Sequence, residues 1–90
     1  MDDEENILRV KGSSSPSSLA AAISHGVYDG RKPVLRAIGA GAVNQAAKAM
    51  AIASQYVAAR GLTLYGKFGF ATVTVPDGEV TAVIIRVIAM

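Results

Sequence analysis

The sequence predicts an α+β domain with the element order β-α-β-α-β-β, in which a four-stranded mixed sheet carries two helices on one face. Two stretches with the periodicity of amphipathic helices alternate with short apolar runs that are typical of strands. The last third of the chain holds two longer apolar runs joined by a Pro-Asp-Gly-Glu turn. Right-handed crossover connections then place both helices on the same side of the sheet.

The first strand and the first helix are expected within the first thirty residues. Residues 6–11 alternate loosely between apolar and polar side chains and predict a strand. A helix is expected to begin at Pro16, because Ser15 can cap its free N–H groups and proline has no N–H group to leave unpaired. Gly30 is a typical residue just beyond a helix end. Apolar residues repeat every four positions and predict the buried side of this helix: Leu19, Ile23 and Val27.

The second strand and the second helix follow directly. Residues 34–38 form a short apolar run with Arg36 as its one charge, which is typical of a covered parallel strand. An alanine-rich helix is expected from about Ala42 to Arg60, with small residues nearly all round that allow close packing on more than one side. Gly61 is expected to end it.

The C-terminal part predicts a hairpin. Residues 62–75 predict a long strand in which Gly66 and Gly69 are candidate positions for a β-bulge. Residues 76–79 predict the turn, in which proline sets the first turn angle and Gly78 takes the αL conformation. Residues 80–88 predict the last strand, with apolar side chains on both faces. The face without helices then needs a cover, so we expect self-association as a dimer or tetramer.

The charge divides the chain in two. Four of the seven acidic residues lie in residues 2–5, whereas residues 6–90 hold nine basic and three acidic residues, a net charge of +6. We therefore expect a flexible acidic tail over residues 1–5 and a single domain over residues 6–90, whose charge favours polyanions as partners. The start of the chain does not resemble a signal peptide, and the long alanine-rich stretch is too polar for a membrane span. A cytoplasmic protein without membrane contact is expected.

The junction between the second strand and the second helix is the strongest candidate for a binding site. Gly39 and Gly41 open a helix whose first N–H groups lack intrahelical partners, and the helix dipole adds positive charge there, so a phosphate is the expected occupant. If the first three strands run the same way, the loops at 12–16, 39–41 and 76–79 meet at one edge of the sheet. The candidate site residues are Lys11, Ser14, Arg36, Gly39, Gly41, Asn44, Gln45 and Lys48.

The sequence gives little support for a catalytic site, a cofactor site or a metal site. The dinucleotide fingerprint fails because its third glycine would fall at Asn44. His25 is the only histidine and there is no cysteine, so we expect His25 at the surface rather than at a metal. No activated nucleophile or acid–base pair can be assembled, and we expect neither an enzyme nor a cofactor. Tyr65, Phe68 and Phe70 beside Lys67 can stack on bases or belong to core and interface, and both interpretations stay open.

Several blocks of this chain resemble one family. They are residues 14–18, residues 37–46 with Lys48, residues 51–53, and residues 77–79 before Thr81 and Ala82. Together they are similar to the stage V sporulation protein S family, over nearly the whole chain from Leu8 to Val87. The resemblance implies a small bacterial protein of sporulation and development, similar in fold to Alba, a dimeric chromatin protein that binds DNA and RNA.

In the Alba fold, the loop before the second helix and the hairpin face nucleic acid. By resemblance this implicates Gly39, Gly41, Asn44, Gln45 and Lys48, with Lys11 and the serine loop as neighbours. The chain departs from the pattern at its hairpin, which is short and carries Asp77 and Glu79. It also departs in residues 65–70. The acidic hairpin argues against insertion into a groove of DNA and favours contact with the phosphate backbone.

The sequence therefore predicts a nucleic-acid-binding regulator of bacterial sporulation and development, with either DNA or RNA as its polymer. The alternative is a non-catalytic protein-interaction or assembly module that acts through an apolar sheet face.

Overall fold

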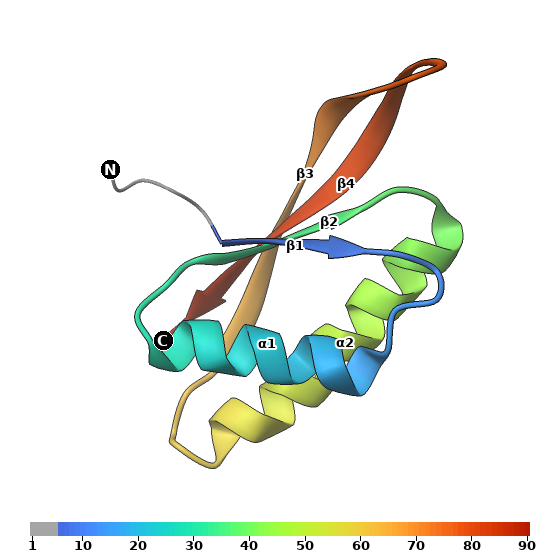
Figure 1. Ribbon diagram of the computed structural model, residues 1–90. Coiled ribbons are helices and arrows are strands. Elements are labelled where there is room, and N and C mark those ends of the chain that lie inside the picture. The colour runs from blue at the N-terminus through green and yellow to red at the C-terminus, as the bar shows by residue number, and fades with distance from the viewer. Residues whose placement is uncertain (1–5) are drawn as a thin grey trace.

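The computed structural model describes residues 6–90. Its elements are β1 (Asn6–Val10), α1 (Pro16–Tyr28), β2 (Pro33–Ala37), α2 (Ala40–Ala58), β3 (Leu64–Val75) and β4 (Gly78–Ala89). The strands form one sheet in the order β1-β2-β4-β3, with β1 and β2 parallel and the other neighbours antiparallel. Figure 1 shows both helices on the same side of this sheet. The predicted α+β fold and its element order are confirmed, whereas the expected acidic tail lies outside the described residues.

The helix starts follow from local chemistry. Ser15 caps α1 as predicted, because its hydroxyl oxygen accepts a 3.3 Å hydrogen bond from the N–H of Ser18. The helix α2 begins at Ala40, two residues earlier than predicted, because Gly39 takes the N-cap position with φ 93° and ψ 157°. Only glycine adopts this backbone region readily, since it has no Cβ.

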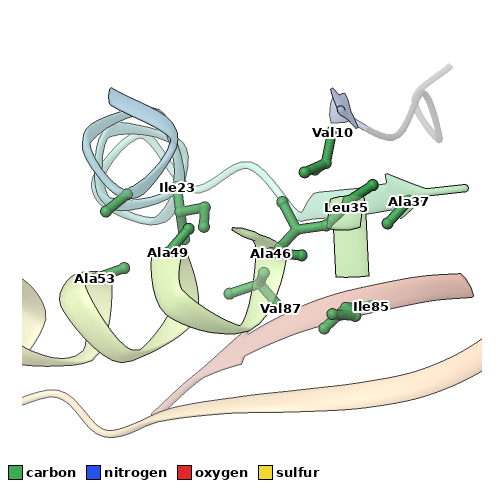
Figure 2. Packing of buried hydrophobic residues seen from close by; sticks show 11 residues of the cluster. Val10, Ile23, Leu35, Ala37, Ala46, Ala49, Ala53, Ile85 and Val87 are labelled. Atoms are coloured by element: carbon green, nitrogen blue, oxygen red, sulfur yellow. The ribbon is translucent and has the colours of Figure 1, made fainter. Parts of the chain in front are cut away.

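The core lies between the helices and the sheet. Figure 2 shows Ile23 of α1 beside Ala49 of α2, with Leu35 of β2 to the right of them and Ile85 of β4 below. Leu35 and Ile85 are both 0% exposed. Alanines on the buried side of α2 bring its backbone close to both α1 and the sheet: Ala42, Ala46, Ala49 and Ala53. The alanine-rich sequence therefore serves close packing on two sides, as predicted.

The two long strands pair without interruption. Their register runs continuously from Leu64 opposite Ala89 to Val75 opposite Gly78, so the bulges predicted at Gly66 and Gly69 are wrong. Gly66 serves packing instead. A Cβ placed there would lie 2.9 Å from Cγ2 of Ile85 and 3.3 Å from Cε of Met50.

The hairpin extends well beyond the rest of the sheet. The strand β2 pairs with β4 only over residues 83–86, so the five outer pairs, from Ala71–Ala82 to Val75–Gly78, have no third strand beside them. Figure 1 shows this part projecting from the body. Gly78 has φ 134° at the turn, which is positive but lies outside the αL region that was predicted. Neither helix within residues 6–90 is long and apolar enough to cross a membrane.

Candidate functional site

The strand directions bring the predicted loops to one edge of the sheet. The strands β2 and β3 both run antiparallel to β4, and β1 runs parallel to β2, so β1, β2 and β3 point the same way. The loops after β1 and β2 touch, because a Cβ on Gly41 would lie 3.5 Å from Cα of Gly12. The hairpin turn lies at the same edge but projects past these two loops (Figure 1). The contact between two helix-opening loops is the centre of the candidate site.

The N-terminus of α2 has free donors for an anion. Gly39 offers no side chain to cap the helix, no acidic residue lies in the first turn, and the first intrahelical bond runs from the N–H of Val43 to the Gly39 carbonyl, 3.0 Å apart. The N–H groups before Val43 therefore have no intrahelical partner, and the helix dipole makes this end positive. At α1, by contrast, Ser15 caps the helix and Pro16 has no N–H to offer. Of the two helix starts at this edge, α2 is the one suited to a phosphate.

Two of the predicted site residues hold the loops together. The hydroxyl oxygen of Ser14 accepts from the backbone N–H of Lys11 at 2.8 Å, and the N–H of Ser14 donates to the Lys11 carbonyl at 3.0 Å. The side-chain amide of Gln45 donates to the Ser14 carbonyl at 2.9 Å. Ser14 and Gln45 are half-buried, and their polar groups form these hydrogen bonds within the protein. Their part in the site is to position the two loops.

The remaining edge residues are exposed. Gly41, Asn44 and Lys48 lie on one side of α2, since they are three and seven positions apart. The Asn44 amide donates to the Gln45 side-chain oxygen at 3.3 Å, which orients it beside the loop. Lys11 follows β1 directly and is exposed. Lys11 and Asn44 thus lie beside the α2 N-terminus, whereas Lys48 lies on the same side of the helix two turns beyond Gly41.

Arg36 does not belong to this group. Its Cα partners across the sheet are Arg9 on β1 and Ile84 on β4. Its neighbours Leu35 and Ala37 are in the core below the helices, so Arg36 lies on the opposite side, which we call the open face because no helix covers it. Three further cations that were not predicted as site residues also lie on the open face: Arg9, Lys67 and Arg86. The alternation of side chains along each strand is a sequence signal that could have placed them there. Finding that they are neighbours requires the strand order.

The open face is not the apolar surface that was predicted. Ile84 and Ile88 do lie on it, but the same strand also contributes Arg86, and β3 contributes Lys67 as its Cα partner. Phe68 and Phe70 are on the other side of β3, since their Cα partners Ile85 and Val83 face the helices. They are 65% and 80% exposed. The expected group of three aromatics beside Lys67 is therefore divided between the two faces of the sheet.

One comparison with known proteins identifies the family. The family model described as stage V sporulation protein S (SpoVS) matches residues 6–90, which include both glycine loops, both helices and the hairpin. The chain belongs to the SpoVS family. The resemblance found in the sequence is confirmed, and SpoVS membership implies a sporulation-associated role for the chain.

Proposed function

We propose that this SpoVS-family chain is a nucleic-acid-binding regulator of bacterial sporulation and development, and that it holds phosphates at the glycine loop and the α2 N-terminus. The observation that carries the proposal is the uncapped start of α2 at Gly39, packed against the loop of Gly12 and flanked by Lys11 and Lys48. The function is non-catalytic and belongs to the cytoplasm. The net charge of +6 over residues 6–90 supports attraction to a polyanion over the whole body.

Binding at this edge uses the phosphate backbone. A phosphate oxygen accepts from the N–H groups of residues 40–42, while the ammonium groups of Lys11 and Lys48 neutralise its charge and that of its neighbour. These contacts fix position and carry little base information. The acidic hairpin, with Asp77 and Glu79, is repelled by a nucleic-acid groove. The binding is therefore driven mainly by counterion release and is weakly dependent on sequence.

The test compares binding of labelled DNA and RNA with salt concentration. Wild-type affinity falls steeply between about 50 and 200 mM salt. Lys48→Glu weakens binding, and it reduces the slope of log affinity against log salt concentration by about 1, the value for one lost phosphate contact. Gln55→Glu is the control, since it adds a negative charge to an exposed position two turns further along α2. Retention of neither polymer at about 50 mM salt rules the proposal out.

We further propose that the protein acts as a homo-oligomer in which a second copy covers Phe68 and Phe70. The exposure of these two rings supports this. They belong to β3, which is at the edge of the sheet and is 12 residues long. An edge strand of that length leaves a row of backbone donors and acceptors for another chain. The oligomer surface is thus expected on β3 rather than on the open face.

A further inference from the structure

We infer that the open face of the sheet is a second binding surface, a basic groove that takes single-stranded nucleic acid. It goes beyond the proposed function, because it uses residues on the opposite side of the sheet from α2 and commits to one form of the polymer. The shape of this face, its charge and the apolar side chains near its cations support this inference.

Two adjoining hollows form the groove. The first is lined by Arg36, Lys67 and Arg86 together with Ile7, Ile84 and the β3 segment 68–73. The second lies at the end of the sheet where β2 starts, and it is lined by Arg31, Lys32, Lys67 and Arg86 and also by Val27 of α1. Because Lys67, Arg86 and Val34 line both hollows, the groove is continuous from the loop before β2 to the middle of the open face. A continuous groove suits a chain-like ligand better than a single small anion.

The charge of the groove selects a polyanion. Arg9 on β1 is the Cα partner of Arg36 on β2. Like charges on directly paired positions destabilise a sheet, and an anionic ligand relieves that repulsion. No acidic residue within 6–90 lines either hollow, although the exposed Asp29 carboxylate lies 3.8 Å from Arg31, one of the cations that line the second hollow.

A second copy of this chain is the wrong occupant. If two open faces met, Arg36, Lys67 and Arg86 of each would come together, and like-charge contact across an interface is strongly unfavourable. The exposed rings of Phe68 and Phe70, on the other side of the sheet, offer an uncharged alternative for self-association.

The apolar side chains between the cations favour a single strand. Ile7 in the first hollow and Ile88 in the second are both exposed, and Tyr65, the Cα partner of Ile88, is 49% exposed on the same face without lining either hollow. Tyr65 is two positions from Lys67 on β3, so the two side chains share a face. The bases of a single strand can stack on such rings and contact isoleucine, while phosphates reach the cations. A duplex keeps its bases stacked inside and offers these apolar groups little.

The experiment measures fluorescence anisotropy with three probes: an oligo-dT and an oligo-U of about 20 nucleotides, and a DNA duplex of the same length. The groove variant is Lys32→Glu/Lys67→Glu. Its matched control at the α2 edge is Lys11→Glu/Lys48→Glu, which reverses the same number of charges. All four lysines are exposed, and circular dichroism with thermal unfolding checks that both variants fold.

The groove variant is expected to bind single strands about tenfold or more weakly, with duplex affinity changed less than about twofold. Unchanged single-strand affinity overturns the inference, and if the edge variant still weakens binding, the proposed function stands. An equal loss for single strands and duplex also overturns it. If only the groove variant loses binding, the groove is supported and the phosphate edge is rejected.

A second variant pair isolates the stacking contribution. Tyr65→Ala is expected to weaken single-strand binding by about fivefold or more, while Tyr65→Phe, which keeps the ring, restores it. Equal affinities of Tyr65→Ala and wild type overturn the assignment of Tyr65 to the groove.

Discussion

The side-chain amide of Gln45 donates a 2.9 Å hydrogen bond to the backbone carbonyl of Ser14, across 31 positions of sequence. This bond ties the start of α2 to the loop after β1. In Gln45→Met the side chain keeps its length but has no donor, so the Ser14 carbonyl loses its partner. We expect the free energy of unfolding, measured with urea, to fall by about 1 kcal/mol. Asn44→Ala, at an exposed position, is the control and is expected to change it little. Equal stability of Gln45→Met and wild type contradicts a role in holding the loops.

Gly66 and Gly69 give a matched pair on β3. Gly66→Ala puts a methyl group 2.9 Å from Cγ2 of Ile85, and the core must shift to admit it. The expected loss is about 1–3 kcal/mol of unfolding free energy. Gly69→Ala meets nothing within 4 Å and is expected to be neutral or mildly stabilising. If chemical denaturation finds the two variants equally stable, the close approach at Gly66 is not limiting.

Gly39 and Gly41 give a second pair, at the candidate site. Gly39 has φ 93°, where a Cβ is strained, so Gly39→Ala is expected to cost about 1–3 kcal/mol and to weaken nucleic-acid binding as the α2 start shifts. Gly41 is already helical, and its added Cβ comes no closer than 3.5 Å to Gly12. Gly41→Ala is therefore expected to fold at least as stably as wild type. Thermal unfolding with a binding isotherm for each variant checks both expectations, and a harmless Gly39→Ala argues against the strained N-cap.

The four acidic residues of positions 2–5 are expected to compete with nucleic acid for the basic body. Deleting residues 1–5 should tighten binding at low salt, with a smaller effect at high salt because screening weakens the competition. A full-length variant with Asp2→Asn, Asp3→Asn, Glu4→Gln and Glu5→Gln separates charge from length. Affinity that is the same with and without these carboxylates dismisses the competition.

The proposed oligomer surface is tested by replacing Phe68 and Phe70 with serine. Both side chains are largely exposed, so the double variant is expected to fold and to become a monomer. Light scattering after size exclusion measures the mass. The matched variant Tyr65→Ser, on the open face of the same strand, is expected to keep the wild-type mass. If the wild-type protein is monomeric at all concentrations, the proposed oligomer surface at Phe68 and Phe70 is wrong.

Features that depend on neighbouring residues, such as helix starts, were predicted well from the sequence. Contacts between residues that are distant in sequence were predicted less well. The start of α1 follows from Ser15 and Pro16 alone, because capping involves only neighbours in sequence. The element order and the placement of both helices on one face of the sheet also followed, since right-handed crossovers leave few alternatives. Gly66 was misinterpreted as a bulge because its real partners, Ile85 and Met50, are distant in sequence.

The positions of the candidate site residues could be predicted only in part for the same reason. The α2 edge is local to the glycine loops, so its residues could be proposed from the sequence, and their binding role stays a prediction. Arg36 was grouped with them by proximity in sequence, although β-strand alternation points it to the open face. Its neighbours there, Arg9 and Lys67, come from strands whose pairing no single stretch reveals.

The projecting hairpin also gives the molecule a direction. Its turn carries Asp77 and Glu79, whereas no basic residue lies beyond Arg86 on β4 or between Lys67 and the turn on β3. The projecting hairpin therefore holds negative charge away from the positively charged body. This separation of charge is an electric dipole along the hairpin. Because the tip projects past the two helix-opening loops at the same edge of the sheet (Figure 1), a polyanion bound at the α2 N-terminus as proposed is expected to approach from the side of α2 that faces away from the hairpin.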